Sequence, residues 1–415
     1  MAQGSKLKVV IVGAGLAGLA TARILREHHD VTVYERASVG NATGGQGICF
    51  FPGTVKILQS MGYDEERGAP CHDNYLETYD KVGNLIAREE LNYVKRYGAN
   101  MWSQLRSDCR DELYRLATAP PQEVGIPEAC GSVKMVYNVA VKDVDPENAV
   151  VTLQDGSTLE FDLVIIADGI HSRLRKKILG PDPKYTAKKM GLTIFRVAVS
   201  AENARKVLGN ELPHFMKPDK HGDGYATYYQ SLDDTNRLIV TYPLHRFDWI
   251  HISLHLPTGA GHGDAESESW HADGNRAEII DAFHDFDEDI MKLVKVGTHI
   301  KVWDMQDLDP IPFWNKGRAI LIGDAAHAMT PMQGQGGNMA VEDAESFRLF
   351  GPNFARSNIP ETLAKIDSVR RPRTARILWG TRATVPTTNL KERVAQLDFS
   401  NSYNGILHAL SEQAE

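Results

Sequence analysis

One stretch in the last quarter of the chain combines the residue types that hold a flat ligand. Residues 317 to 344 read GRAILIGDAAHAMTPMQGQGGNMAVEDA. The apolar run Ala319 to Ile322 predicts a buried parallel strand, and Gly323 lets the chain turn so that Asp324 stands at the strand's carboxyl end. A carboxylate there can hold a sugar-like hydroxyl. The helix that follows points its amino end at the ligand, and three glycines before it remove side chains that would block a flat ring: Gly334, Gly336 and Gly337. We interpret this segment as a flavin site.

The amino end predicts a second ligand-binding element, a strand–turn–helix–strand unit that carries a glycine pattern. The pattern is G-x-G-x-x-G, in which Gly13 makes the tight turn, Gly15 admits a pyrophosphate and Gly18 lets the helix pack on the strand. An acidic residue about twenty positions further on, Glu35, is placed to bond a ribose hydroxyl. The alternative is that the glycines serve packing only, and the flanking elements argue against it. Those predicted elements are strand Lys8 to Val12, helix Leu19 to Glu27 and strand Val31 to Tyr34.

The composition excludes several classes of function. The chain has 415 residues, of which 42% are hydrophobic and 24% charged, as in ordinary globular proteins. A net charge of −8, without a basic run, argues against a nucleic-acid partner. No apolar stretch approaches the roughly 20 residues of a spanning helix, and residues 1 to 8 do not resemble a secretory signal. The four cysteines show no metal spacing, so we expect a cytoplasmic protein without a metal site.

The order of the predicted elements indicates one discontinuous domain with an insertion. A hairpin is expected over 75–91, buried strand 163–167 follows, and short alternating segments over 191–256 predict an antiparallel sheet. The polar insert 258–275 is expected to be a loop or lid, and the last seventy residues are mainly helical. We predict an α/β fold: a discontinuous Rossmann-like FAD-binding domain (1–74, 99–185 and 304–350), an inserted antiparallel β-sheet substrate domain (75–98 as a hairpin, and 186–303) and a helical C-terminal region (351–415).

These segments, in this order, resemble the single-component flavin-dependent aromatic hydroxylases, the group that includes salicylate and para-hydroxybenzoate hydroxylases. The first shared motif is the glycine turn with Glu35. The second is Asp168-Gly-Ile-His-Ser-Arg-Leu-Arg175, which matches D-G-x-x-S-x-x-R after a buried strand. The third is Gly323-Asp324 with the later glycine cluster. The resemblance runs from Val9 to about Arg376, and residues 370–373 (Arg-Arg-Pro-Arg) resemble the family's basic helix start.

The resemblance implies a set of cofactor residues. Asp324 would hold the ribityl or pyrophosphate region, and the glycines after it would lie against the flavin pyrimidine. Arg106 is preferred over Arg110 as an arginine that meets the flavin. Arg175 could pair with a phosphate or with Asp168, and a packed structural role is expected for His327. The predicted cofactor-binding residues are Gly13, Gly15, Gly18, Glu35, Arg36, Gly47, Arg106, Asp168, Asp324, Pro331, Gly336, Gly337 and Asn338.

Substrate residues are predicted less directly. By the same resemblance the strand around Arg196 faces the flavin, so Arg196 could meet an anionic or phenolate group, or polarise a developing oxyanion; an exposed strand arginine is the alternative. Phe215, Tyr228 and Tyr242 lie on alternating segments that could wall a flat pocket, although core packing also explains aromatic residues on strands.

The reaction implied by the resemblance is oxygen transfer. FAD reduced by NADPH or NADH reacts with O2 to give a C4a-hydroperoxide, which hydroxylates an aromatic or indole-like small molecule. Two alternatives stay open: a related flavoprotein of secondary metabolism that epoxidises or dearomatises its substrate, and a flavin-bound protein without turnover. The oligomeric state is expected to be a monomer or homodimer.

Overall fold

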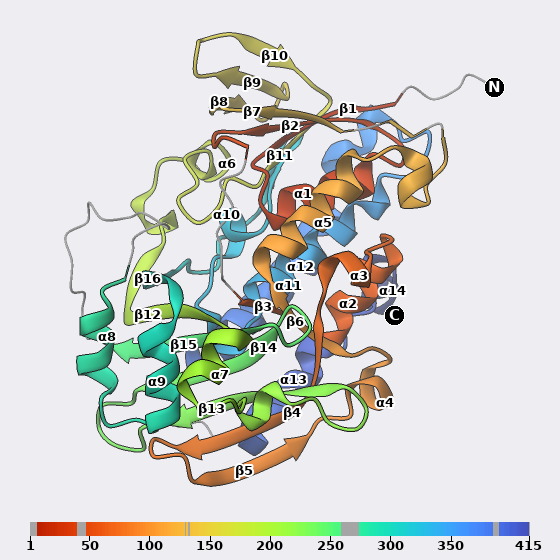
Figure 1. Ribbon diagram of the computed structural model, residues 1–415. Coiled ribbons are helices and arrows are strands. Elements are labelled where there is room, and N and C mark those ends of the chain that lie inside the picture. The colour runs from red at the N-terminus through yellow and green to blue at the C-terminus, as the bar shows by residue number, and fades with distance from the viewer. Residues whose placement is uncertain are drawn as a thin grey trace.

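Two large sheets lie at opposite ends of the molecule, and long helices fill the space between them (Figure 1). The computed structural model describes residues 6–39, 47–128, 130–131, 133–258, 274–384 and 390–414. Most of the insert predicted as a loop or lid lies outside these residues. Among the described residues, no helix is both long enough and apolar enough to cross a membrane.

The smaller of the two large sheets has six strands and draws them from three distant parts of the sequence, as expected for a discontinuous nucleotide-binding unit. Its strands are parallel, except that the edge strand β17 runs antiparallel to β18. Residues of β1, β11 and β18 are almost wholly buried, which explains their unbroken runs of Val, Ile and Leu. In spatial order the strands are β17 (Asn315–Lys316), β18 (Ala319–Leu321), β11 (Leu163–Ile166), β1 (Lys8–Val12), β2 (Asp30–Glu35) and β7 (Lys134–Tyr137).

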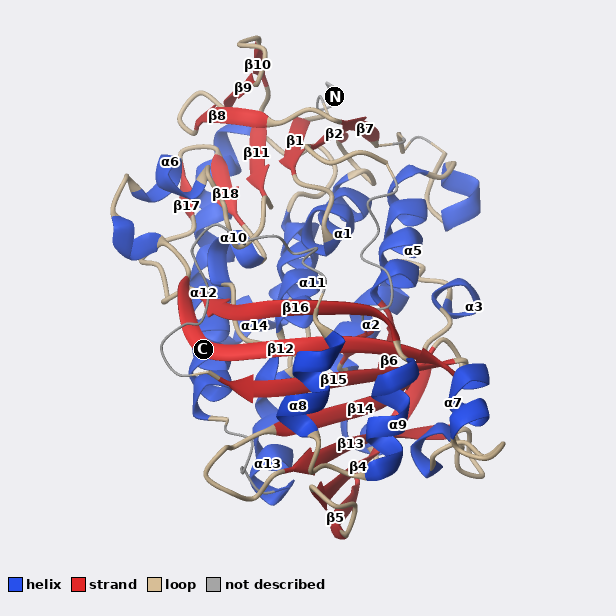
Figure 2. Cartoon of the chain, turned by 60° about the vertical axis from the view of Figure 1, so that its left-hand side comes forward, coloured by secondary structure: helices blue, strands red, loops and turns tan. Residues whose placement is uncertain are grey.

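The larger sheet has nine strands and forms a platform across the other end of the molecule (Figure 2). It is mixed rather than purely antiparallel, because β13 pairs with β4 in parallel. The predicted hairpin is confirmed as β4 and β5. The strands, in spatial order, are β16 (Thr298–Asp307), β12 (Lys188–Ser200), β15 (Trp249–Pro257), β14 (Leu238–Leu244), β13 (Asp223–Gln230), β4 (Cys71–Asp80), β6 (Met101–Leu105) and β3 (Gly47–Phe50), with β5 (Leu85–Glu90) on β4.

The strands β3 and β6 belong to this sheet, although the sequence analysis assigned both to the nucleotide-binding unit. A small third sheet, β8 (Val141–Asp145), β9 (Val150–Leu153) and β10 (Thr158–Glu160), lies beside the six-stranded one. Local sequence pattern predicts that a strand exists, but it does not reveal with which distant strand it forms hydrogen bonds.

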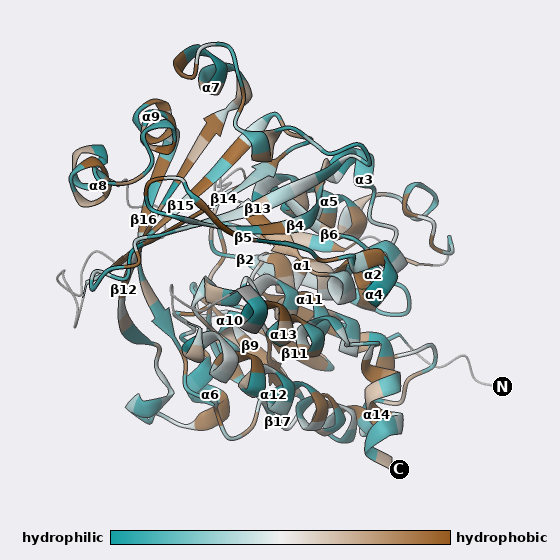
Figure 3. Ribbon diagram, turned by 90° about the horizontal axis from the view of Figure 1, so that it is seen from below, coloured by the Kyte–Doolittle hydropathy of each residue, from teal (hydrophilic) through white to brown (hydrophobic). Residues whose placement is uncertain are grey.

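The helices divide between the two faces of the nine-stranded sheet (Figure 3). Helices α8 and α9 cover one face and bury an apolar cluster that includes Phe195, Ile252 and Phe283. Helices α11 to α13 lie on the other face, which holds the polar groups described below. The longer helices are α1 (Leu16–Leu25), α2 (Pro52–Ser60), α5 (Arg106–Thr118), α7 (Ala201–Val207), α8 (Arg276–Phe283), α9 (Glu288–Val296), α11 (Gly336–Ser346), α12 (Ile359–Ala383), α13 (Leu390–Asn401) and α14 (Ile406–Ala414).

Short helical segments complete the chain. Six of these described segments are 3-10 helices, and one of the six, η4, begins the glycine-rich turn. They are α3 (Glu65–Gly68), α4 (Tyr93–Tyr97), α6 (Arg175–Leu179), α10 (Asp324–His327), η1 (Pro121–Val124), η2 (Pro183–Tyr185), η3 (His214–Met216), η4 (Pro331–Gln333), η5 (Phe347–Leu349) and η6 (Arg356–Asn358).

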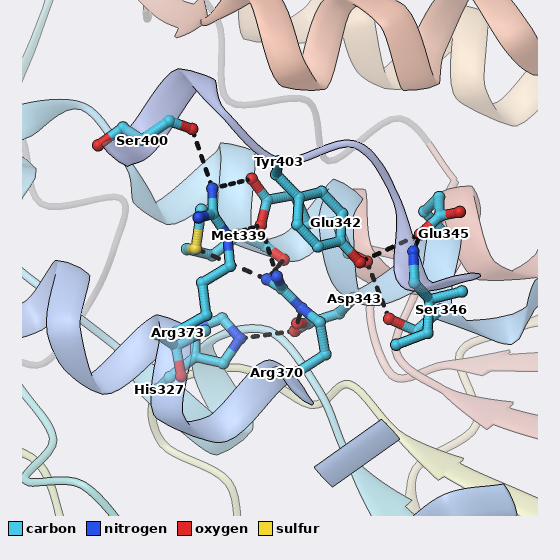
Figure 4. A network of polar contacts seen from close by, with 12 residues as sticks. His327, Met339, Glu342, Asp343, Glu345, Ser346, Arg370, Arg373, Ser400 and Tyr403 are labelled. Carbon is cyan, nitrogen blue, oxygen red and sulfur yellow. Dashed lines mark hydrogen bonds and ion pairs between the residues drawn. The ribbon is translucent and has the colours of Figure 1, made fainter. Parts of the chain in front are cut away.

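A buried ion network joins α10, α11 and α12 (Figure 4). Asp343 accepts hydrogen bonds from Arg370 at 3.0 Å and from His327 at 2.6 Å, and from the backbone N–H of Gly323 at 2.9 Å. Burial acts against the ionised carboxylate, but the charges of His327 and Arg370 hold the pKa of Asp343 below its usual value. Arg370 is wholly buried and also pairs with Glu342.

Arg373 extends this network to the carboxyl-terminal helices. It pairs with Glu342 at 2.7 Å and donates to the carbonyl oxygens of Phe399 and Ser400 at the end of α13. The basic segment predicted as a helix start therefore lies inside α12, with Pro372 in its interior. This prediction was wrong because proline is usually excluded from helix interiors. Here Arg370 and Arg373, which flank the proline at a short distance, form ion pairs with α11.

Replacing Arg370 with methionine should destabilise the protein. The change leaves the buried carboxylates of Asp343 and Glu342 without one of their cations, and we expect a loss of about 3–5 kcal/mol in the free energy of unfolding. Urea denaturation would measure it. The matched control is Arg371→Met, which removes a partly exposed partner of Asp367 and should cost about 1 kcal/mol or less. Equal losses in the two variants would contradict the role given to the network.

Candidate functional site

The glycine turn after β1 contains two glycines that the fold requires and one that it does not. Gly13 has φ of +108°, and a Cβ there would lie 2.3 Å from the carbonyl oxygen of Ala167. A Cβ at Gly18 would lie 2.0 Å from the carbonyl oxygen of Gly13. At Gly15 a Cβ would meet nothing within 4 Å. Open space beside Gly15, at the amino end of α1, fits the predicted approach of a pyrophosphate.

Glu35 ends β2 beside this turn and holds its shape. One carboxylate oxygen accepts the backbone N–H of Ala14 and the other accepts that of Ala37, both at 2.8 Å. Each oxygen keeps capacity for a second donor, so the carboxylate can still accept the hydroxyls of a ribose. Arg36 follows directly and its side chain is exposed.

The second and third motifs meet through Arg175. Its buried guanidinium donates to the backbone carbonyls of Ala325 at 2.7 Å, Ile170 at 2.8 Å and Asp324 at 3.3 Å. Among the described residues Arg175 forms no ion pair with Asp168, because the guanidinium instead joins the backbones of the two motifs. Its role is therefore to position them.

Asp168 and Asp324 stand at the carboxyl ends of neighbouring strands, β11 and β18. Asp168 lies against the glycine turn, since its Cα would be 3.4 Å from a Cβ at Gly13. One of its carboxylate oxygens accepts the backbone N–H of Arg173, and the other is buried without a partner among the described residues. Burial raises the pKa of Asp168. An acceptor without a partner at this edge fits a ligand that brings a donor.

The glycine-rich turn of η4 and α11 lies against β3. Pro331 begins η4, Gly336 begins α11, and a Cβ at Gly337 would lie 2.7 Å from the side chain of Ile48. Asn338 accepts the backbone N–H of Phe51 and donates to the carbonyls of Cys49 and Gly334. Its side chain thus ties the turn to β3, so a contact of Asn338 with a cofactor would come from its backbone N–H.

The polar face of the nine-stranded sheet brings Arg196 close to β3. The Tyr242 ring and His251 crowd Gly47, where a Cβ would lie 2.6 Å from the Tyr242 hydroxyl and 2.9 Å from His251. Burial and then the nearby Arg196 charge lower the pKa of His251 well below its usual value, so the ring is neutral. Burial likewise lowers the pKa of Arg196, helped by the charge of Arg106. Predicted residues from four distant segments therefore gather here.

Three other predicted residues have different surroundings. Arg110 lies toward Tyr137 at the end of β7. Burial raises the pKa of Tyr137, and the charge of Arg110 acts in the opposite direction. The charge of Arg106 acts instead on Arg196. Phe215 is wholly buried among the side chains under α8 and α9, on the opposite face of the sheet. The structure does not bring Phe215 to the site. Tyr228 lies on the polar face, where the guanidinium of Arg393 stacks on its ring at 4.8 Å.

A cavity that is partly open to solvent lies between this sheet, η4 and α13. The sequence analysis found only Tyr228 among the residues that line it. An aspartate inside strand β4, Asp73, was a usable signal because strands are poor in Asp, but helix α13 carried none. The apolar lining includes Phe51, Leu76, Leu91, Tyr93, Met101 and Ala226.

Comparison with known proteins agrees with this geometry. Residues 6–349 match the family model described as "FAD binding domain". A 3-amino-4-hydroxybenzoate 2-monooxygenase of Streptomyces platensis is 30% identical over 346 residues, which are 81% of this chain and 77% of that protein. A 6-hydroxynicotinate 3-monooxygenase of Pseudomonas fluorescens is 29% identical and covers 81% of this chain and 80% of its own.

The structural comparison supports the predicted fold class. A solved salicylate hydroxylase in a substrate complex superposes with a TM-score of 0.76 at 23% identity, covering 98% of this chain and 97% of that one. Agreement over nearly the whole of both chains confirms the predicted combination of nucleotide-binding unit, inserted sheet and helical carboxyl end.

Two glycine substitutions should separate cofactor binding from folding. Gly15→Val places its side chain in open space, so we expect the free energy of unfolding of the cofactor-free protein to change by about 0.5 kcal/mol or less while FAD affinity falls at least about tenfold. Gly18→Ala drives a Cβ into the backbone and should cost about 3 kcal/mol. Fluorescence titration with FAD and urea denaturation would measure both effects. Normal FAD affinity in Gly15→Val would refute the role of Gly15.

Proposed function

We propose a reaction for this chain on the basis of its family. The chain belongs to the FAD-binding-domain family, whose model matches residues 6–349. It is an FAD-dependent monooxygenase, and its substrate on this proposal is a small aromatic molecule that it hydroxylates with NADPH or NADH and O2. Both relatives described above carry names of monooxygenases that act on hydroxylated aromatic rings. The observation that carries the proposal is the meeting of three sequence motifs at one edge of the parallel sheet, next to the cavity.

The residues present fit the cofactor. The open space at Gly15, the remaining capacity of Glu35 and the partnerless oxygen of Asp168 lie along the carboxyl ends of β1, β2 and β11. The glycine-rich turn before α11 would take the ring end, because the amino end of that helix stabilises negative charge. When bound, FAD supplies the redox chemistry: it accepts hydride from the nicotinamide and activates oxygen.

The chain's own residues orient the substrate and exclude water. Arg196 supplies a cation on the sheet face, where it can hold an anionic or phenolate oxygen. Burial and then the charge of Arg196 lower the pKa of His255 to about 3, so His255 is neutral at neutral pH. The apolar walls of the cavity keep a flat ring away from water. No side chain needs to act as a nucleophile in this reaction.

The setting proposed is the cytoplasm, with a monomer or homodimer as the working unit. The four cysteines are all free, and three of them are buried. Free cysteines without a disulfide are typical of a reducing compartment.

Substrate-dependent reduction is the first experimental test. Under anaerobic conditions, NADPH or NADH should bleach the flavin absorbance of the purified protein faster when the correct phenol, aromatic acid or indole is present. Aerobic reaction in 18O2 should then add one labelled oxygen atom to that compound. Flavin reduction that never responds to an aromatic compound, or a product without label, would contradict the proposed reaction.

Arg196→Met should slow product formation while FAD stays bound. We expect turnover to fall about tenfold or more, which corresponds to about 1.4 kcal/mol in the activation free energy. The flavin content of the purified variant should match that of the wild type. Arg205→Met, which changes an exposed arginine on α7, is the matched control. Unchanged turnover in Arg196→Met would remove Arg196 from the substrate site.

A further inference from the structure

The cavity beside η4 contains a buried carboxylate that no described residue satisfies. Asp73 on β4 is 2% exposed and lines this cavity. Neither of its carboxylate oxygens has a hydrogen-bond partner among the described residues. The nearby hydroxyl of Ser103 donates instead to the carbonyl oxygen of Pro243, at 2.7 Å.

Such a group is costly in a protein interior. A buried carboxylate without donors loses its hydration and gains nothing in return, so folded proteins rarely keep one without a purpose. A carboxylate with a structural role would be expected to accept backbone N–H groups, as Glu35 does, or to face an arginine, as Asp343 does. Asp73 does neither, and it lies in the wall of a partly open cavity.

The groups around Asp73 do not compensate its charge. The groups that interact with it are neutral or acidic: Asp223 and Tyr228 on β13, Ser103 on β6, Cys49 on β3, Tyr93 on α4, Tyr242 on β14, and Cys71 on its own strand. Among the described residues that line the cavity, the one arginine is Arg393 on α13, which stacks on the ring of Tyr228. Burial, and secondarily the charge of Asp223, raise the pKa of Asp73 to about 7, although Ser103 acts in the opposite direction. The carboxylate therefore takes up or releases its proton near neutral pH.

A second polar group without partners lines the same cavity. The side-chain amide of Gln335 is 1% exposed, and neither its oxygen nor its nitrogen has a partner among the described residues. Gln335 precedes α11, at the predicted ring end of the cofactor. The cavity thus presents an acceptor at β4 and an amide near the proposed reaction centre, with mainly apolar side chains between them.

We propose that this cavity is the substrate site and that Asp73 selects substrates by accepting a hydrogen bond from a phenolic hydroxyl. This inference rests on the proposed function and adds the substrate class. The substrate is a flat aromatic molecule whose hydroxyl points toward β4, while the amide of Gln335 contacts a polar substituent near the cofactor. A hydroxyl supplies the donor that Asp73 lacks, whereas a methoxy group in the same place leaves the carboxylate unsatisfied.

Ligand binding to the FAD-loaded protein tests this selection directly. Anisole carries a methyl group in place of the hydroxyl hydrogen of phenol and so lacks the donor, and the binding of both compounds can be followed by the change in the flavin spectrum. At pH 8, where Asp73 is mainly ionised and can only accept, wild type should bind phenol at least about tenfold more tightly than anisole. Asp73→Leu should lose that preference and bind phenol at least tenfold more weakly, and Asp73→Asn should reduce the preference. Asp111→Leu makes the same chemical change at an exposed carboxylate on α5 and should behave as wild type.

Stability provides a readout that needs no ligand. Because the pKa of Asp73 is higher in the folded state than in the unfolded chain, Asp73 lowers the free energy of unfolding progressively as the pH rises from about 4 to about 7. Asp73→Leu should therefore raise the urea midpoint, and raise it more at pH 8 than at pH 5. A lower midpoint at both pH values would show that Asp73 supports the fold.

The outcomes separate this inference from the proposed function. Equal binding of phenol and anisole by wild type, or an unchanged preference in Asp73→Leu, overturns the role of Asp73 even if FAD binds and substrate-dependent reduction is observed. Failure to bind FAD is measured separately by titration and overturns the proposed function instead. Loss of the preference together with a raised midpoint in Asp73→Leu supports the inference.

Discussion

The buried pairing of Arg370 with Asp343 and Glu342 is the constraint on which the proposed site depends. Through Asp343 it fixes the backbone of Gly323 and the ring of His327, and so the position of Asp324 at the end of β18. Through Glu342 and Arg373 it reaches the end of α13, which forms one wall of the cavity. Burial of the Arg370 guanidinium without its carboxylate partners would cost free energy of folding, so all of these partners must be in place together. The cofactor edge and the cavity wall are therefore held by the same set of contacts.

The sequence predicted the nucleotide-binding unit in detail because its signals are local. The run Lys8 to Val12 and the spacing of Gly13, Gly15 and Gly18 depend only on neighbouring residues, and β1 has the predicted bounds. The role of Arg175 could not be predicted, since two of its partners are the backbone carbonyls of Ala325 and Asp324, which lie 150 and 149 positions away. The cavity was missed for the same reason. Asp73, Gln335 and Arg393 lie in three distant segments and line one cavity only when those segments fold together.

The two faces of the nine-stranded sheet have different roles. Neighbouring residues of one strand therefore either pack in the apolar core or point toward the proposed site. Along β12, Phe195 and Val197 pack under α8 and α9, while Arg196 between them points to the opposite face. The same alternation explains Phe215 and Tyr228, aromatic residues with similar local patterns and different surroundings. An aromatic residue on a strand fits either face, so local pattern alone could not choose between core and pocket. The apolar side stabilises the platform, which lets the other side carry groups that weaken it.

Helix α13 lies outside the residues that match the family model, which end at 349, yet it supplies Arg393, Gln396 and Leu397 to the cavity. On the proposed function, one wall of the substrate cavity therefore comes from outside the segment that carries the three cofactor motifs. Relatives could keep every glycine and acid of the three motifs and still accept rings of different size or charge. In such a family, the sequence of the carboxyl-terminal helix would indicate which substrate a member accepts. The three motifs would indicate only that it belongs to the family.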